Sequence, residues 1–553
     1  MSGTGVSEGA ASPNTSNNSG SGESTSSGET RELTFEEARK IDSERAPLSK
    51  WVLGSYGAPA TPLAMVGLPM AVFLPAVYAD SQGYGLGLAF VGLVLVLARF
   101  FDGVTDPIVG LLSDRVRTRW GRRKPFILLG TPIYILGICM LFIPPFEFSD
   151  ISIFGATFST GYPWMLGMLI VIYVGSTIKD VPYSAWGAEL STDYNERTLI
   201  TSWREGFGVT GSLIGAFTPA IIFFFGYDRP TDSVYFLSLA IAIVMPVLVI
   251  NMLISVPEYP VTERKSEPLP LKESFKYVWQ NDPYRRLIIV FLFSTIGAAM
   301  TNTLSFFFVK HVLLAGALFG FYLAPYFVSQ LVAIPLWFKL SRRIGKHRAT
   351  MVAIGWYALW SCMIPLIAIA PAEWFDPFQI KNILAFLPDE AYASAVAYFE
   401  GKPTGKFLFF IIVMCLKGSS IGALSALPYA MAADVIDVDA AQTGKRQGGA
   451  YFSIWSMTRK LAYALGLFVG TNLVVFWGFN SLADPINTTN SQFSLLMLAV
   501  TYSVIPALFK FVAMPLLWNY PLTEERVAEI QLEIAQENIA KAEAEQASPS
   551  PAR

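Results

Sequence analysis

The stretch FDGVTDPIVGLLSDRVRTRWGRRKP, residues 101–125, joins an apolar segment to a cationic one. Its first half carries two acids, Asp102 and Asp106, among apolar residues. Its second half places six lysines and arginines within ten residues. This pattern predicts a membrane helix that ends in a cationic loop. The two acids then need a polar environment inside the protein, because a charge at the centre of a bilayer costs about 2.5–3.5 kcal/mol on insertion scales.

The composition of the whole chain also indicates a membrane protein. Of its 553 residues, 53% are hydrophobic and 15% are charged, whereas soluble proteins carry about 25% charged residues. The net charge of −2 gives no reason to expect a nucleic-acid partner. Three cysteines lie in apolar runs and only two histidines occur. We therefore expect no disulfide framework, structural metal site, cofactor or enzymatic triad.

Twelve segments are apolar enough to cross a membrane, since a spanning helix needs roughly 20 mainly apolar residues. They are residues 51–79, 88–113, 124–145, 163–190, 198–226, 234–255, 286–314, 317–340, 349–371, 407–435, 448–477 and 492–518. A charged segment, residues 256–285, divides them into two sets of six. We therefore predict an all-α membrane protein with one six-helix bundle in residues 47–255 and another in residues 286–518.

The loops and tails predict the orientation in the membrane. Lysines and arginines gather after the second, eighth and tenth segments, and short loops of this kind face the cytoplasm. Both termini are then expected in the cytoplasm, and the short loops favour a bacterial inner membrane. Residues 1–46 are polar, lack the apolar core of a signal peptide and are predicted to be disordered. Residues 519–553 are expected to form a cytoplasmic tail with a short amphipathic helix.

The two halves of the chain resemble each other. SDRVRTRWGRRKPF follows the second segment and LSRRIGKHRAT follows the eighth. DVPYSAWGAEL lies in the fourth segment and ALPYAMAADVI in the tenth. The second segment thus pairs with the eighth and the fourth with the tenth, as a duplication of six helices predicts. Parallel repeats of this kind build the major facilitator fold.

The cationic loop and several further motifs resemble one transporter family. FDGVTDPIVG followed by DRVRTRWGRRKP resembles the glycoside–pentoside–hexuronide:cation symporters of the major facilitator superfamily, the melibiose permease group. KDVPYSAW, NERTLITSWREGFG and MAADVIDVD with SMTRKLAYALG follow in the family's order. The resemblance runs from about residue 50 to residue 518. It implies twelve helices in two bundles and cation-coupled transport.

Three acids inside predicted helices are candidate cation ligands. Asp102 and Asp106 are four residues apart, so they lie on one face of a helix. A cation between two such carboxylates stabilises both, and without it one of them must take up a proton. The resemblance implies that these two and Asp180 bind the cation, and that Asp180 also serves the sugar. The alternative is that the acids only pair with basic residues.

The resemblance also implies intramembrane cations. Arg204 in the fifth segment has a planar fork that can bind carboxylates or sugar hydroxyls. Lys460 in the eleventh segment is a mobile charge that could replace the coupling cation in an empty site, and Arg459 competes with it for this role. Aromatic rings on the same segments could pack on a sugar, or they could only pack within the protein. The candidates are Tyr183, Trp186, Trp203 and Trp455.

The cationic loop itself predicts a tight turn between two helices. Its motif residues are Asp114, Arg115, Gly121, Arg122 and Arg123. We expect them to fix the topology and to pair with acids at neighbouring helix ends, such as Glu189, when the cytoplasmic side is closed. Exposed pairs of this kind contribute about 0–1 kcal/mol, which suits a contact that must open.

The first segment departs from the family pattern. Melibiose-type members carry an intramembrane aspartate there, whereas GSYGAPATPLAMVG, residues 54–67, contains no acid. Four prolines at positions 59, 62, 69 and 75 predict an irregular helix. This favours a glycoside other than melibiose, or a larger or less polar solute.

We therefore predict a monomeric secondary transporter that couples sodium or protons to the uptake of a sugar or glycoside by alternating access. An exporter or a carrier of lysophospholipid-like solutes is the main alternative. A polytopic membrane enzyme or a sensor derived from a transporter are further hypotheses. The first lacks a cluster of catalytic residues, and the second would be expected to lose the acids that this chain retains.

Overall fold

The computed structural model describes residues 48–522 and Glu529, except residues 82, 116–117, 119, 154–155, 192–193, 228, 259–278, 380–403, 444–447 and 486–489. Several helical side chains, including those of residues 106–115, 188 and 189, also lie outside the described set. The predictions for residues 1–46, for the tail helix and for most of the central loop fall outside it. So do those for the side chains of Asp106, Asp114 and Arg115.

The described helices form twelve rods, as predicted. Those of the N-terminal half are α2 (Lys50–Gly57), α3 (Ala60–Leu68), η1 (Pro69–Phe73), α4 (Leu74–Ala79), α5 (Leu88–Arg115), α6 (Lys124–Phe142), α7 (Gly161–Glu189), α8 (Tyr194–Phe223) and α9 (Pro230–Ser255). Those of the C-terminal half are α11 (Asp282–His311), η2 (Gly316–Leu318), α12 (Phe319–Ile344), α13 (Lys346–Ile369), η3 (Ala372–Phe378), α16 (Thr404–Gly418), α17 (Ile421–Thr443), α18 (Gly448–Phe476) and α19 (Gln492–Trp518).

Length and composition explain why these rods can cross a membrane. Within the described residues, eleven rods are long and apolar enough to do so. The remaining rod, α5, has 28 residues, or about 42 Å at a rise of 1.5 Å per residue. The observed ends lie within a few residues of the predicted ones for most rods, which confirms the predicted fold class.

The first rod is irregular, as its prolines predicted. α2 ends at Gly57, two residues before Pro59, and α3 is followed by the π-helical segment η1, which begins at Pro69. Proline lacks the backbone N–H that a regular helix requires, so the hydrogen-bond ladder is interrupted at these points. Ser49 caps the start of α2, because its side chain accepts a hydrogen bond from the backbone N–H of Val52.

The tenth rod is also broken, and this break was not predicted. α16 ends at Gly418 and α17 begins at Ile421. The hydroxyls of Ser419 and Ser420 donate to carbonyls at the end of α16, each at 2.7 Å. The indole N–H of Trp337 donates to the carbonyl of Ser419, also at 2.7 Å. These bonds satisfy polar groups that a break would otherwise leave unpaired inside a membrane.

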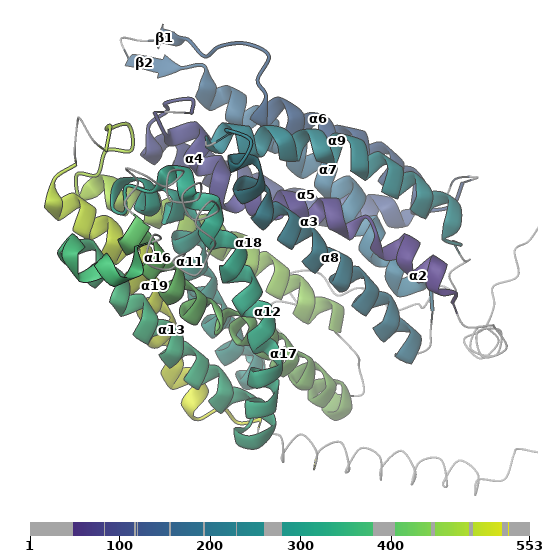
Figure 1. The fold of residues 1–553 in the computed structure, drawn as a ribbon. Helices are drawn as coiled ribbons and strands as arrows, with labels where there is room; N and C mark the ends of the chain where they lie inside the picture. The colour runs from purple at the N-terminus through teal and green to yellow at the C-terminus, as the bar shows by residue number, and fades with distance from the viewer. Residues whose placement is uncertain are drawn as a thin grey trace, which may run out of the picture.

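The rods form two bundles that lie side by side (Figure 1). α2 to α9 make up the N-terminal bundle and α11 to α19 the C-terminal one. Among the described elements, α5 packs against α18, α12 against α8, and α11 against η1 and α4, so these pairs join the bundles. The described parts of α2 and α17 make their main contacts within their own bundles.

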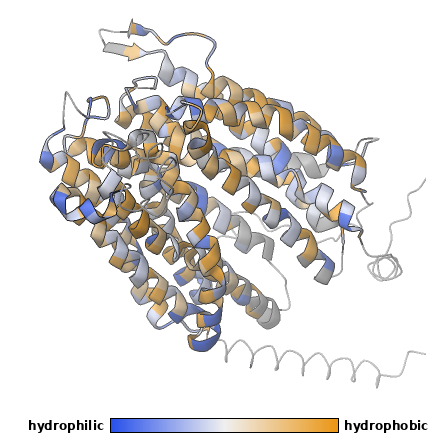
Figure 2. Ribbon diagram, in the orientation of Figure 1, coloured by the Kyte–Doolittle hydropathy of each residue, from blue (hydrophilic) through white to orange (hydrophobic). Residues whose placement is uncertain are grey.

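Hydrophobic residues predominate along the rods of both bundles (Figure 2). Exposed large residues occur along most rods, for example Leu97 on α5, Val247 on α9 and Leu336 on α12. In a soluble protein such a surface would drive aggregation. In a bilayer it faces lipid tails and needs no polar partner.

A short β-hairpin, which the sequence did not predict, marks one face of the molecule. Strands β1 (Asp150–Ile153) and β2 (Ala156–Ser159) pair antiparallel between α6 and α7, with Asp150 opposite Ser159. It projects beyond the rods (Figure 1). We call this end the hairpin face. The opposite end, which bears the α5–α6 and α12–α13 loops, is the cationic face.

Candidate functional site

A charged pair joins the two bundles near the middle of their rods. Asp102 on α5 accepts from Lys460 on α18, with 3.0 Å between Lys460 Nζ and Asp102 Oδ2. Arg99, one turn before Asp102, lies 3.6 Å from the same oxygen. The Asp102 side chain is 6% exposed and that of Lys460 is 17% exposed. Breaking such a buried pair by removing one partner costs about 3–5 kcal/mol, because the other charge remains buried.

Arg99 extends this contact between the bundles. Its guanidinium carbon lies 4.8 Å from the ring centre of Tyr173 on α7 and 5.6 Å from that of Tyr463 on α18. Cation–π contacts of this kind are favourable within about 6 Å. The sequence interpretation missed Arg99. Its spacing of three residues from Asp102 was the available signal, since that spacing places two side chains on one helix face.

Asp180 has its own cation, which the sequence interpretation also missed. Lys179 Nζ donates to Asp180 Oδ1 at 2.6 Å, and Ser176 Oγ donates to Asp180 Oδ2 at 2.5 Å. The Asp180 side chain is 38% exposed, whereas that of Lys179 is 3% exposed. Lys179 Nζ also lies 4.0 Å from the ring centre of Tyr134 on α6. The carboxylate is therefore accessible although its cation is buried.

The structure thus places two of the three predicted acids with separate cations. Asp102 pairs across the bundles and Asp180 pairs within α7. The side chain of Asp106 lies outside the described residues, so its distance from either acid is not defined. Of the two candidate basic residues on α18, Lys460 contacts Asp102. Arg459 is exposed and makes no ion pair with the described residues.

Arg204 and Trp203 lie in the cationic-side half of α8. Arg204 pairs with its neighbour Glu205 at 3.0 Å, and their side chains are 31% and 67% exposed. Separating this exposed pair therefore costs little free energy, so both side chains can bind water or a solute instead. Trp203 packs on the first rod, 3.6 Å from the position that a Cβ would take at Gly54. The ring of Phe207 lies beside it, with 6.2 Å between the ring centres.

The other three predicted aromatic residues pack within their bundles. Tyr183 and Tyr56 each donate to the other's backbone carbonyl, at 2.8 and 3.1 Å, and tie α7 to α2. Trp186 is 1% exposed and donates to the carbonyl of Pro257 at 3.1 Å. Trp455 is 2% exposed and stacks on Phe291, with 4.2 Å between the ring centres. In this conformation these side chains hold helices together, and their contact with solute remains a prediction.

The cationic loop forms a tight turn, as predicted, around an acid that was not predicted. Gly121 has a φ of +108°, and its backbone N–H donates to the carbonyl of Thr118. The next two backbone N–H groups, of Arg122 and Arg123, donate to Glu258 Oε1 at 2.5 and 2.7 Å. Glu258 follows α9, so the loop is tied to the end of the sixth rod. The side chain of Glu189, the expected partner, lies outside the described residues.

The corresponding loop of the second half is tied down in a similar way. Lys346 at the start of α13 pairs with Asp434 on α17, with 2.6 Å between Nζ and Oδ2. Both side chains are partly exposed, at 34% and 27%. Each bundle thus has its own polar contact at the cationic face.

A buried ion pair joins the bundles at the hairpin face. Lys310 Nζ at the end of α11 lies 2.7 Å from both carboxylate oxygens of Asp80, which follows α4. Their side chains are 7% and 1% exposed. Asp80 and Lys310 belong to different halves of the chain, and no local sequence pattern predicted their pairing.

Aromatic and small residues close the hairpin face around this pair. Phe73 of η1 meets Phe319 of α12 at 5.5 Å, and Phe223 of α8 meets Phe321 at 5.3 Å between ring centres. A Cβ at Gly320 would lie 2.6 Å from Cβ of Pro219, so α12 and α8 are in close contact. One buried apolar cluster contains residues of both bundles here. The cationic-side half of the C-terminal bundle has a separate cluster.

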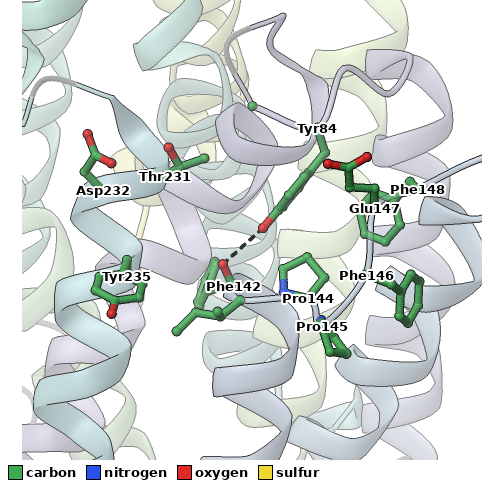
Figure 3. Close-up of a pocket in the computed structure, with 12 residues that line it drawn as sticks. Tyr84, Phe142, Pro144, Pro145, Phe146, Glu147, Phe148, Thr231, Asp232 and Tyr235 are labelled. Carbon is green, nitrogen blue, oxygen red and sulfur yellow. Dashed lines mark hydrogen bonds between the residues drawn. The ribbon is translucent and has the colours of Figure 1, made fainter.

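A groove lies on the hairpin face (Figure 3). It has a volume of about 610 Å³ and is lined by the α6–β1 loop, the start of α9 and the loop after α4. Tyr84 in this groove donates to the carbonyl of Phe142 at 3.1 Å, and burial raises the pKa of Tyr84 to about 12. None of the predicted site residues lines the groove. The groove lies within the N-terminal bundle. Separating the two bundles would therefore not connect it to the cationic face.

Comparison with known proteins agrees with this architecture. A family model described as MFS/sugar transport protein matches residues 55–524. An uncharacterized symporter of Synechocystis is 25% identical, with 88% of this chain and 96% of that protein covered. A putative glycoside/cation symporter of Escherichia coli, YagG, is 24% identical over 88% of this chain and 95% of its own. A sodium-dependent lysophosphatidylcholine symporter of Danio rerio is 24% identical, covering 90% of each chain.

Solved structures share the fold. The nucleoside transporter NupG superposes with a TM-score of 0.52 at 14% identity, covering 85% of this chain and all of that one. At this identity the match concerns the arrangement of helices alone. It agrees with the arrangement of two bundles described above.

Proposed function

Because the chain belongs to the MFS/sugar transport protein family, a family of transporters rather than enzymes, we propose that it couples sodium or protons to the entry of a sugar or glycoside. The chain is a multi-pass membrane protein whose relatives are symporters. We further propose a bacterial inner membrane, with the cationic face and both termini in the cytoplasm. Lysine and arginine in the α5–α6 and α12–α13 loops support this orientation.

The charged contact between α5 and α18 is the observation that carries this proposal. Asp102 and Lys460 belong to different bundles, so any change in their pairing acts on the contact between the bundles. A cation that binds Asp102 would release Lys460, because one carboxylate cannot fully neutralise both. The binding of an ion and the movement of the bundles would then be linked through one salt bridge.

The contacts between the bundles support alternating access with the hairpin face closed. Asp80 with Lys310 and the aromatic contacts of α12 lie at that face. The exposed groups Asp180 and Glu205 lie in the cationic-side halves of α7 and α8. A solute released from these side chains would leave towards the cationic face.

A carrier of amphipathic, lysophospholipid-like solutes is the second candidate. One relative is named as a sodium-dependent lysophosphatidylcholine symporter, and it matches this chain as extensively as the glycoside relatives do. The first rod of this chain also lacks an acid that would bind sugar hydroxyls. Both candidates share the fold and the coupling charges and differ in the solute.

Reconstituted vesicles would test the proposal. The purified protein is offered mono- and disaccharides, glycosides and, separately, lysophosphatidylcholine, while external sodium and pH are recorded. We expect one solute to draw sodium or protons inward. Asp102→Asn should abolish this ion movement, whereas Asp150→Asn on the exposed hairpin should not change it. Entry of lysophosphatidylcholine but of no sugar would favour the second candidate. Silence with every solute, from protein shown to be folded, would count against both.

A further inference from the structure

Lys179 is a buried cation that lies directly against a candidate ligand of the coupling ion. Its side chain is 3% exposed and its ammonium contacts Asp180 at 2.6 Å. Within the described part of the chain, no second carboxylate lies within ion-pairing distance of Lys179. A buried ammonium needs groups that replace its water, and here they are the carboxylate and the ring of Tyr134, 4.0 Å away. Lys179 and Asp180 therefore form one electrostatic unit.

Close packing of α6 against α7 holds this ammonium in place. A Cβ at Gly130 on α6 would lie 2.8 Å from the backbone nitrogen of Lys179 and 3.0 Å from its Cβ. A Cβ at Gly175 on α7 would lie 2.5 Å from the backbone nitrogen of Tyr134. The two helices can approach this closely only because both positions are glycine. The stem of Lys179 has little freedom, so its ammonium stays between Tyr134 and Asp180.

Both oxygens of the Asp180 carboxylate are already engaged. Oδ1 accepts from Lys179 and Oδ2 accepts from Ser176 at 2.5 Å. A sodium ion takes oxygen ligands of this kind, so at Asp180 it would compete with the ammonium for Oδ1. The carboxylate is 38% exposed, which leaves it open to solute hydroxyls that donate hydrogen bonds without displacing the lysine.

We propose that the Lys179 ammonium takes the place of a coupling ion at the Asp180 carboxylate. This inference rests on the proposed function, because it divides the roles within the same site. Asp180 serves the solute, and the coupling ion acts at Asp102 and Asp106, where Lys460 is the cation that it displaces. Removing the Lys179 ammonium converts Asp180 into a carboxylate that needs a sodium ion or a proton.

Sodium-dependent stabilisation of the purified protein tests this inference without any solute. The melting temperature is measured while sodium replaces choline, at neutral and at acidic pH. The variants are Lys179→Met and Lys179→Gln, each with and without Asp180→Asn, and Lys179→Arg as the variant that retains the charge. Size-exclusion profiles show which variants are folded, and the two neutral variants serve as alternatives to each other.

We expect Lys179→Met or Lys179→Gln to gain a second response to sodium or to acidic pH, located at Asp180 and additional to ion binding at Asp102, which the wild type and Lys179→Arg lack. For binding at Asp180, the half-saturating sodium or proton concentration should be at least about tenfold lower than with the ammonium in place, which corresponds to 1.4 kcal/mol. Adding Asp180→Asn should abolish the gain. A shift with sodium alone identifies sodium as the ion that Lys179 replaces, and a shift with pH alone identifies the proton.

Two results would overturn the inference. The first is that Lys179→Met or Lys179→Gln is folded, but its sodium and pH responses do not change when Asp180→Asn is added. The other is a wild-type sodium response that Asp180→Asn alone removes, since sodium would then bind Asp180 beside the lysine. Failure of the vesicles to transport any solute would reject the proposed function while leaving the outcome of this binding test intact.

Discussion

Replacing Lys310 by methionine removes one partner of the buried ion pair that joins the bundles at the hairpin face. Asp80 would remain 1% exposed without its ammonium, which lies 2.7 Å from both of its oxygens. Loss of one partner from such a pair costs about 3–5 kcal/mol. Opening the hairpin face would hydrate Asp80 and recover part of this cost. Since 1.4 kcal/mol is tenfold, even about 3 kcal/mol would shift the equilibrium towards the open form by about a hundredfold.

Labelling of an engineered cysteine measures this shift. Thr471 on α18 is fully buried against α5, where a Cβ at Gly92 would lie 2.0 Å from its hydroxyl oxygen. Thr471→Cys is introduced into a chain whose three native cysteines are alanine, and a membrane-impermeant maleimide is added. We expect slow labelling with Lys310 present and labelling about a hundredfold faster with Lys310→Met. Ser149→Cys, on the exposed loop before β1, should react at the same rate in both backgrounds.

Exchanging the two charges separates the ion pair from other effects of substitution. Asp80→Lys together with Lys310→Asp should return the labelling of Thr471→Cys towards the slow rate, because the pair is restored in reverse. Equal labelling rates for Lys310→Met and for the unsubstituted chain would refute the reasoning. The reasoning would also be refuted if the chain with both charges exchanged were labelled as fast as the chains with a single substitution.

Two further predictions concern stability. Gly121→Ala should lower the free energy of unfolding by about 1–3 kcal/mol, since a Cβ would lie 2.0 Å from Glu258 Oε2 and φ is +108°. Gly226→Ala is its control, because φ is +88° there but a Cβ meets nothing within 4 Å. Equal losses in melting temperature would show that the contact with Glu258 is unimportant. Tyr183→Phe should cost about 1 kcal/mol in thermal unfolding, through loss of its hydrogen bond to Tyr56; an unchanged melting temperature would contradict this.

The positions of the rods could be predicted because they depend on the length and apolarity of single segments. The twelfth rod begins and ends where the sequence predicted, at residues 492 and 518. The prolines of the first rod predicted its irregularity. The break between α16 and α17 was missed, since Ser419 and Ser420 give no strong signal and the indole N–H that bonds to the Ser419 carbonyl comes from Trp337 on another rod.

The partners of the charged residues were harder to predict, because they depend on packing between distant segments. Lys310 and Asp80 are 230 residues apart, and no local pattern connects them. Lys179 is adjacent to Asp180, and neighbours on a helix do not ordinarily face each other. They pair because α6 packs closely against α7 and leaves the lysine side chain in contact with the carboxylate. Lys460 was predicted as a coupling cation, but its contact with Asp102 could be seen only in the structure.

Simultaneous recording of solute and ion entry in vesicles tests the central claim most directly. The claim is that Asp102, paired with Lys460 across the bundles, links ion binding to solute movement. The account predicts that solute entry brings sodium or protons with it, and that Asp102→Asn loses this ion movement. Solute entry without any ion movement, or ion movement that Asp102→Asn leaves unchanged, would contradict it.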